Sequence, residues 1–398
     1  MKGGYSLIQF ASSRGQGLCL EAAELALALQ AAGVRVCVLT SPGEQFAGTF
    51  ELLRANMQVR ICDQLDGNWL STNRRQVQFL VEVARENGLR GPVVFHGWGI
   101  LHALLIKRAI LVLGKLERGI ISRSVIIPAF LHHGSWYESA AYLVAARILR
   151  WAADAVIAQC WDMERKLSHY GVPKYKIYTI YPGRDIESFR KKARLPLPPE
   201  FHPDNLTSVN GQPLSKAIPK VAYLGLYIAR KDHLTLFRAI RYLKQLGRPV
   251  GCICLGWGPQ REKLIDLVHE LDIADLVVLA GRLDQNFVPA FISEMDLVVS
   301  ASRAETFGHT LIEPLILGKP VVTTRVGVAF ELESVQGAKV VNPGDWRGLA
   351  ESIAWVLDHP VEVANMVKRG QEFVLANYDI NIVAHRFANL YESLIARE

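Results

Sequence analysis

Short runs rich in β-branched residues alternate with longer runs of helical character along most of this chain. Residues Tyr5–Phe10 predict a strand, Cys19–Ala32 a helix and Val34–Thr40 the next strand, because the apolar period and the residue types change from one run to the next. A strand, a helix and a second strand in this order form a parallel βαβ unit. Further strands are predicted at Val93–His96, Val125–Leu131, Ala155–Ala158, Val250–Leu255, Leu276–Ala280, Leu297–Ser300 and Pro320–Thr324. The alternation therefore predicts an α/β fold built on open, mostly parallel sheets.

The alternation is interrupted once, near the middle of the chain. Six prolines fall between residues 190 and 220, and proline disfavours the interior of both helices and sheets. Beyond them a strand at Val221–Leu224 restarts the pattern, and 398 residues suit two domains of ordinary size. We therefore predict two Rossmann-like domains that face each other across a cleft. The predicted parts are an N-terminal domain over 1–198, a linker over 199–218, a C-terminal domain over 219–377 and a helix over 378–398 that crosses back onto the first domain.

The charge of the chain is uneven. Lys and Arg outnumber Asp and Glu by seven overall, and the excess lies in the first 200 residues. One interpretation is an anionic partner, either a phosphorylated substrate or a membrane surface. The other is a solvated basic face without a partner. Lys107, Arg108 and Lys115, with Leu and Ile between them, leave the same choice open, since this segment fits a membrane surface or a helix packed on the first sheet.

Two features bear on where the protein works. No run of about 18 apolar residues lacks a charge, so no membrane span is expected. The six cysteines form no Cys-x-x-Cys pair, and none lies near a histidine at zinc-ligand spacing. We interpret all six as buried free thiols and expect a cytoplasmic protein, with peripheral contact at the inner membrane face as an open alternative.

Residues 302–313 carry the clearest chemical signal, because they follow a predicted strand and open a helix. The first backbone N–H groups of a helix point out of its start and attract anions. Here they belong to Gly308, His309 and Thr310. Glu305 and Glu313 flank this anion site, and carboxylates accept hydrogen bonds from the paired hydroxyls of sugars. A diphosphate between two diols describes a nucleotide sugar.

The same segment resembles the Glu-x7-Glu signature of retaining glycosyltransferases of the GT-B fold, family 4. The order of further motifs along the chain agrees with this family. Five more segments are similar to the family's pattern: Val221–Gly225, Leu255–Pro259, Ala280–Arg282, Leu317–Val322 and Val341–Asp345. The likeness is good over roughly residues 150–395 and loose before them.

The resemblance implies roles for individual residues. Glu313 would hold the ribose hydroxyls, Glu305 the hydroxyls of the transferred sugar, and Lys231 would neutralise the diphosphate. His133 matches a family histidine that contacts the donor sugar from the first domain. The remaining implied donor contacts are the Gly15-Gln16-Gly17 turn, Gly225, Arg282 and the amides around Phe307, Gly308, His309 and Thr310.

One position departs from the family. An arginine usually follows the strand glycine, whereas Leu226 follows Gly225 here. A hydrogen bond to a charged group contributes about 1.5–3 kcal/mol, so its loss would weaken donor binding about 10- to 150-fold. Either Arg230, where the family often has glutamate, substitutes for it, or the site is impaired.

The resemblance thus implies a retaining, metal-independent hexosyltransferase that uses a nucleoside-diphosphate sugar and needs no cofactor. We expect a lipid-linked acceptor in bacterial surface polysaccharide synthesis and no nucleic-acid partner. Three alternatives stay open: a small-molecule acceptor, a nucleotide-sugar epimerase of the same fold, or an inactive nucleotide-binding homologue.

Overall fold

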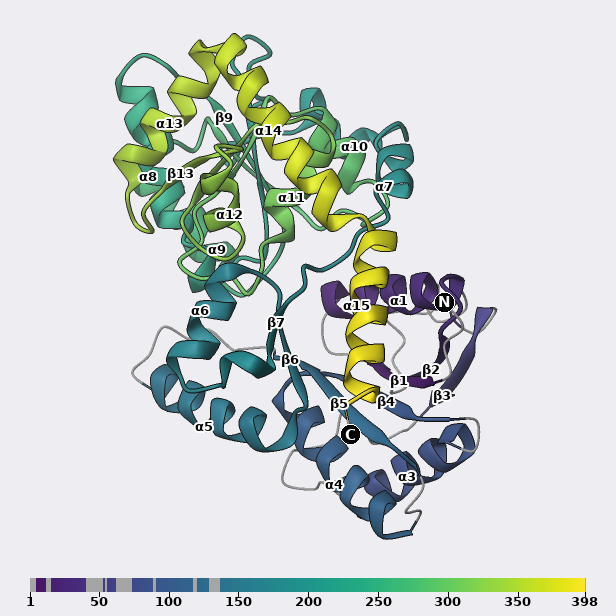
Figure 1. Cartoon of the computed structure of the whole chain (residues 1–398). Coiled ribbons are helices and arrows are strands. Elements are labelled where there is room, and N and C mark those ends of the chain that lie inside the picture. The colour runs from purple at the N-terminus through teal and green to yellow at the C-terminus, as the bar shows by residue number, and fades with distance from the viewer. Residues whose placement is uncertain are drawn as a thin grey trace. The chain divides into compact units, whose positions relative to one another are not determined.

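The protein divides into two compact units in the computed structural model, which Figure 1 shows as a ribbon. The structure describes residues 5–11, 16–40, 53, 56–61, 74–88, 91–116, 120–128 and 137–397. The first unit contains the described residues up to Asp185 and those from Asn377 onward, and the second contains Ile186–Ala376. Two crossings of the chain therefore join the units.

A parallel sheet with strand order β3-β2-β1-β4-β5-β6-β7 forms the centre of the first unit. Its strands are β1 (Ser6–Ala11), β2 (Arg35–Thr40), β3 (Gln58–Ile61), β4 (Val93–Trp98), β5 (Ser122–Ile127), β6 (Ala155–Ala158) and β7 (Ile177–Thr179). All six residues of β4 and all four of β6 are buried, as expected for central strands that are covered on both faces.

Helices cover both faces of this sheet (Figure 1). They are α1 (Gln16–Ala31), α3 (Arg74–Gly88), α4 (Ile100–Leu116), α5 (Tyr137–Ala152), α6 (Trp161–His169) and α15 (Ile380–Ile395). The helices α3, α4 and α5 form one layer in which α4 contacts both neighbours, whereas α15 packs on α1. Among the described residues no helix combines the length and the apolar character that a membrane span requires.

The C-terminal helix α15 contributes to the core of the first unit. Its Phe387, Tyr391 and Leu394 share one buried cluster with Leu7 of β1 and Val94 of β4. The Tyr391 hydroxyl also lies 2.7 Å from Nδ1 of His96. Burial lowers the pKa of His96 to about 3, so this histidine is neutral and serves the core.

The second unit is built on a parallel sheet with strand order β10-β9-β8-β11-β12-β13. The strands are β8 (Lys220–Leu224), β9 (Gly251–Leu255), β10 (Val277–Gly281), β11 (Leu297–Ser300), β12 (Val321–Thr324) and β13 (Lys339–Val341). The helices are α7 (Ile186–Lys192), α8 (His233–Gln245), α9 (Arg261–Glu270), α10 (Val288–Ser293), α11 (His309–Ile316), α12 (Ala329–Ser334), α13 (Trp346–Asp358) and α14 (Pro360–Tyr378). The predicted α/β class with two parallel sheets is confirmed.

The expected linker over 199–218 is packed on the second unit instead of bridging two bodies. Leu206 and Leu214 are buried, and the Val209 N–H donates to the Val277 carbonyl oxygen over 2.8 Å. The segment thereby gives hydrogen bonds to β10, the edge strand of the sheet. Its prolines prevent a regular helix or strand, but they do not prevent this packing. In the part of the chain that the structure describes, the first crossing between the units follows Asp185.

The cysteine prediction holds for the residues that can be checked. Cys37, Cys160, Cys252 and Cys254 are free and buried. Cys254 follows Cys252 by two on β9, and their Sγ atoms lie 3.9 Å apart, because alternate residues of a strand share a face. The predictions for Cys62 and for the side chain of Cys19 lie outside what the structure describes.

Candidate functional site

The order of strands in the second sheet brings two distant loops together. Strands β9 and β10 lie on one side of β8, and β11 to β13 lie on the other. The carboxyl ends of neighbouring parallel strands meet at one edge, and ligands of open α/β sheets bind where the strand order reverses. The loops that follow β8 and β11 therefore share this edge. The Arg303 N–H donates to the Arg230 carbonyl oxygen over 2.9 Å and ties the loops together.

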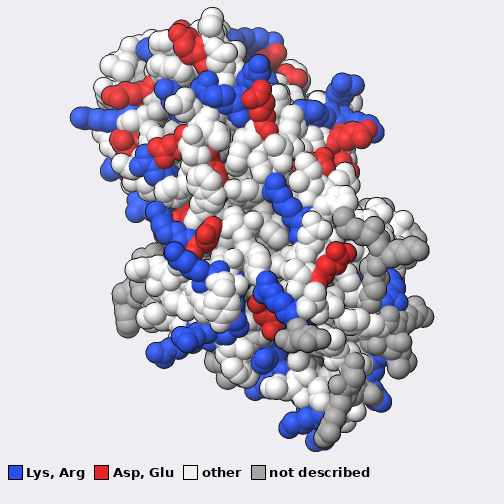
Figure 2. Space-filling model, in the orientation of Figure 1, with Lys and Arg blue, Asp and Glu red and all other residues white. Residues whose placement is uncertain are grey.

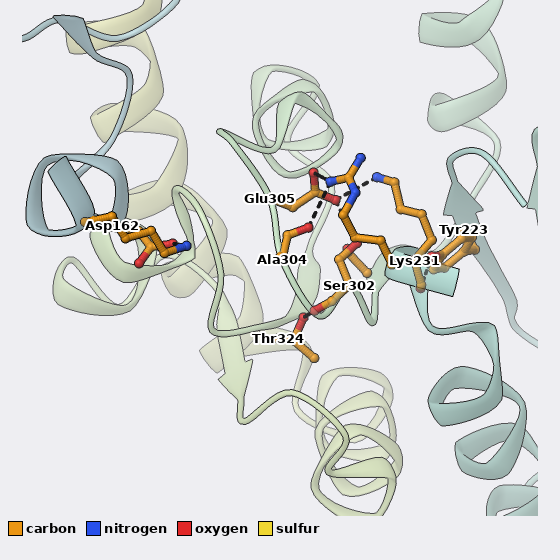
Figure 3. Close-up of polar contacts among 10 residues, drawn as sticks. Asp162, Tyr223, Lys231, Ser302, Ala304, Glu305 and Thr324 are labelled. Carbon is orange, nitrogen blue, oxygen red and sulfur yellow. Dashed lines mark hydrogen bonds and ion pairs between the residues drawn. The ribbon is translucent and has the colours of Figure 1, made fainter. Parts of the chain in front are cut away.

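One carboxylate is held between two cations at this edge (Figure 3). The Lys231 ammonium lies 2.7 Å from Oε1 of Glu305, and the Arg230 guanidinium lies 2.9 Å from Oε2. The side chains of Lys231 and Glu305 are only 11% and 10% exposed, and that of Arg230 is 27% exposed. We call these three side chains the clamp. Two positive charges and one negative charge leave the clamp with a net positive charge.

Hydrogen bonds fix Glu305 from the other side. The Ser302 hydroxyl donates to Oε1 of Glu305 over 2.7 Å, and the Thr324 hydroxyl donates to the Ser302 carbonyl oxygen over 2.6 Å. Arg230 also donates to the Ala304 carbonyl oxygen over 2.9 Å. Because Ser302 follows β11 and Thr324 ends β12, the sheet itself holds the carboxylate in place.

The pKa of Glu305 reflects this environment. Burial favours the neutral acid, but the charges of Lys231 and Arg230 outweigh it and lower the pKa to about 2. Glu305 is therefore ionised at neutral pH, and both cations are neutralised in part.

This shift gives a pH-dependent stability. A carboxyl whose folded pKa lies below its unfolded value of 4.5 stabilises the protein above that value, and the benefit is lost as the pH falls toward 2. Relative to Glu305→Gln, the wild type should be more stable by on the order of 3 kcal/mol at about pH 7. Urea unfolding should find a smaller difference at about pH 3, and a difference that does not change with pH would contradict the assignment.

Lys231 is positioned by its own loop. The Tyr223 hydroxyl donates to the Lys231 carbonyl oxygen, and Asp232 adopts a left-handed conformation (φ 47°) that caps α8. A Cβ atom at Gly225 would lie 3.1 Å from Cε of Lys231. The glycine thus leaves room for the lysine side chain to pass over the end of β8 toward Glu305. Arg303 pairs with Asp232 at 2.9 Å and completes the loop.

Helix α11 begins beside the clamp residue Glu305. Its N-cap is Gly308, whose φ of 109° lies in the region that favours glycine, so α11 starts at His309. The N-terminus of a helix carries a partial positive charge. Glu313 lies in this helix and is buried. The predicted anion site therefore sits on a helix start, four residues along the chain from Glu305, which pairs with both cations.

The other predicted residues fall in different places. Gly225 directly follows β8 and lies against Lys231, and Arg282 follows β10, two strands from β8. Gln16 and Gly17 are the first residues of α1 in the first unit. The predictions for Gly15 and His133 lie outside the described residues. Phe307 is buried, and its ring lies 4.9 Å from that of His309.

Sequence reasoning missed the supporting residues of this site. They are Tyr223, Asp232, Ser302, Arg303 and Thr324. The spacing Ser302-x-x-Glu305 was a visible signal, because a hydroxyl three residues before a carboxylate can reach it in a turn. Arg303 and Thr324 act through hydrogen bonds to residues that are distant in the sequence, which spacing does not reveal.

Two family models match the chain. Residues 209–373 match the model described as glycosyl transferases group 1, and residues 22–188 match that of glycosyltransferase family 4. Two curated relatives are a 2-deoxystreptamine glucosyltransferase of Streptomyces kanamyceticus and the lipopolysaccharide core biosynthesis glycosyltransferase LpsD of Rhizobium meliloti. The first is 25% identical over 45% of this chain and 47% of its own. The second is 27% identical over 54% of this chain and 59% of its own length. The chain thus spans about half the length of these relatives.

Solved structures agree on the fold. The Anabaena protein HepE in complex with UDP superposes with a TM-score of 0.73 over 98% of this chain and 100% of its own, at 17% identity. The sucrose-phosphate synthase of Thermosynechococcus elongatus superposes with a TM-score of 0.73 over 99% of this chain and 100% of its own, at 19% identity. At this identity the likeness concerns the fold.

Proposed function

The chain belongs to the glycosyltransferases of the GT-B fold, group 1 and family 4 type, and from this premise we propose that it transfers a sugar from a nucleoside-diphosphate sugar to an acceptor hydroxyl. The clamp is the observation that carries the proposal. The clamp places two cations at the ligand-binding edge of a parallel sheet, and helix α11 adds its N-terminus there. That arrangement suits a diphosphate. The names of two solved neighbours, complexes with UDP and UDP-glucose, support such a donor.

In this proposal Glu305 occupies the two cations until the diphosphate of the donor binds to them. A diphosphate carries more negative charge than one carboxylate, so it competes for Lys231 and Arg230. Once the two cations turn to the diphosphate, the oxygens of Glu305 are released to accept hydrogen bonds from the sugar hydroxyls. Glu313, buried on α11, would hold the ribose hydroxyls. The ion pairs that preorganise the empty site are thus exchanged for contacts with the donor.

The chemistry follows from where charge develops. The bond between the anomeric carbon and the diphosphate oxygen breaks, and its electron pair goes to the diphosphate. Lys231, Arg230 and the α11 N-terminus stabilise that charge without a metal ion, and one such preorganised donor typically contributes about 10²- to 10³-fold in rate. The acceptor hydroxyl attacks the anomeric carbon on the same face of the sugar, which gives retention, and its proton passes to the departing diphosphate oxygen.

For the acceptor we propose a lipid-linked intermediate of bacterial surface polysaccharide, handled in the cytoplasm. The relative named for lipopolysaccharide core biosynthesis supports this class. A small-molecule acceptor is the second candidate, supported by the relative named a 2-deoxystreptamine glucosyltransferase. Incubation with radiolabelled donor and either membrane lipid extract or aminocyclitols would separate them, because the label would partition into the organic or the aqueous phase.

A thermal-shift series with UDP, GDP, ADP and dTDP in EDTA tests the donor site. We expect one nucleotide to raise the melting temperature, which would identify the base and show binding without a metal ion. If none raises it at millimolar concentration, the transferase proposal fails and an inactive homologue remains. Release of an isomeric free sugar nucleotide during incubation with the donor would instead point to an epimerase.

Arg230 should take over the work of the arginine that Leu226 replaces. Its guanidinium reaches the same carboxylate as Lys231, whereas Leu226 is 42% exposed. Arg230→Leu should weaken nucleotide binding about 10- to 100-fold, since a charge-assisted hydrogen bond is lost. Adding Leu226→Arg in the double variant should recover part of that loss. Calorimetric titration measures both, with Arg241→Leu on the exposed side of α8 as the control. Unchanged affinity in Arg230→Leu would refute the substitution.

A further inference from the structure

Helices α4 and α5 expose an unusual number of apolar side chains. Large hydrophobic residues that are 37–59% exposed are Leu101, Leu111, Val112 and Leu116 on α4 and Leu143, Val144 and Trp151 on α5. These seven are nearly half of the sixteen such side chains among the described residues, although the two helices are only 17 and 16 residues long. A concentration of this kind marks an interaction site, since scattered exposed hydrophobics are ordinary but patches are not.

The exposed side chains lie away from the core. In α4 the buried residues are Ala103, Leu105, Ile106, Ala109 and Leu113. Leu111 falls on the opposite side of the helix, and Leu101 and Val112 lie at the exposed margin of the buried face, where a soluble protein normally places polar residues. Helix α4 contacts α5, and Lys107 of α4 lies 5.8 Å from the ring centroid of Trp151 of α5. The two apolar stripes therefore adjoin each other.

Basic residues are interleaved with this apolar surface. The two helices contain Lys107, Arg108, Lys115, Arg147 and Arg150, against Glu138 as their only acidic residue. Figure 2 shows Lys and Arg along the lower edge of the first unit, where Figure 1 places α4 and α5. The surface thus combines apolar contact area with charge of one sign.

Burial and the nearby cations Lys107 and Arg150 lower the pKa of Lys176, against the opposing effect of Asp154. The Lys176 ammonium also donates to the Arg150 carbonyl oxygen over 2.9 Å. The positive potential therefore continues past the end of α5.

We propose that the outer face of α4 and α5 docks this protein on an anionic lipid bilayer. Apolar side chains enter the boundary between headgroups and acyl chains, while Lys and Arg pair with anionic headgroups. Charge complementarity decides between this occupant and a second copy of the chain. Two copies placed face to face would bring five cations against five, which is unfavourable. The proposal stands apart from the transferase activity, because it concerns surface residues outside the clamp.

Sedimentation of the full chain with vesicles tests the proposal. We expect binding to phosphatidylcholine vesicles that contain phosphatidylglycerol, weak binding to phosphatidylcholine alone, and release by high salt. Lys115→Glu/Arg147→Glu should weaken binding at least about 25-fold, since each basic residue contributes roughly fivefold. Leu111→Asn/Val144→Asn should weaken it by roughly tenfold. Arg238→Glu/Arg241→Glu makes the same charge change on α8 of the second unit and should leave binding unchanged.

Three results would overturn the proposal. One is equal binding to both kinds of vesicle. Another is an equal loss in the α4–α5 and the α8 charge variants, which would mean that net charge alone acts. The last is a dimer in light scattering that Leu111→Asn/Val144→Asn converts to a monomer, because a second copy would then cover this face. If these variants keep the nucleotide thermal shift of the wild type, they are folded, and a loss of vesicle binding is then a loss of docking.

Discussion

Replacing Lys231 by methionine should lower kcat/KM for sugar transfer by about 100-fold or more. The ammonium is the shortest cation contact of the clamp, at 2.7 Å from Glu305, and it is buried where water screens it little. Removing one preorganised donor from such a site typically costs about 10²- to 10³-fold. Methionine keeps most of the volume beside Gly225, so the loop retains its packing. Steady-state assays with the donor identified by thermal shift give the measurement.

The matched control is Arg303→Leu. Arg303 is a cation of the neighbouring loop that pairs with Asp232 instead of Glu305, and its side chain is 63% exposed. Its replacement should change kcat/KM by less than about tenfold, because the Arg303 side chain is largely exposed and Asp232 keeps its hydrogen bonds from Thr235. Equal losses in the two variants would mean that overall positive potential acts, and not the placement of Lys231. An unchanged melting temperature without nucleotide shows that both proteins fold.

Replacing Gly327 by alanine should destabilise the second unit by about 3 kcal/mol or more. Gly327 has φ 57°, and a Cβ atom there would lie 2.2 Å from the Phe307 carbonyl oxygen and 3.0 Å from Cβ of Glu305. Left-handed backbone costs alanine about 1–2 kcal/mol, and overpacking adds about 1–3 kcal/mol. The displaced loop also carries Glu305, so nucleotide binding should weaken too. Urea denaturation gives the free energy of unfolding.

Gly344→Ala separates the two causes. Gly344 has φ 83°, but an added Cβ would meet no atom within 4 Å. This variant should therefore lose only the free energy that left-handed backbone costs alanine, about 1–2 kcal/mol. It should bind nucleotide normally. If both variants lose the same free energy, steric contact with Phe307 has no part in the effect.

The sequence predicted central strands better than edge strands. Strands β6 and β11 have the bounds expected from their apolar runs, Ala155–Ala158 and Leu297–Ser300. The missed strands β3, β7 and β13 all lie at the edge of a sheet. The side chains of β7 and β13 are half-buried, so selection for an apolar run is weak there. The remaining edge strand, β10, was found, and the segment 199–218 covers it.

The sequence predicted individual residues of the candidate site better than the contacts between them. The sequence identified Glu305, Lys231 and Arg230 individually, by motif and by resemblance. It did not predict that Glu305 pairs with both cations, since 74 residues separate Lys231 from Glu305. The pairing depends on β8 lying beside β11, and strand order is a property of the whole sheet. Hydrophobic periodicity is local and carries no information about it.

The position of α15 in the first unit has a consequence for the order of folding during synthesis. Residues Ile186–Ala376 are all synthesised before α15, so the second unit has its complete sequence earlier than the first. The core of the first unit stays incomplete until Phe387 and Tyr391 are synthesised and pack into it. Purified chains truncated before residue 380 should therefore resist protease in their second half and be cut in their first, which reverses the usual order of N-terminal before C-terminal.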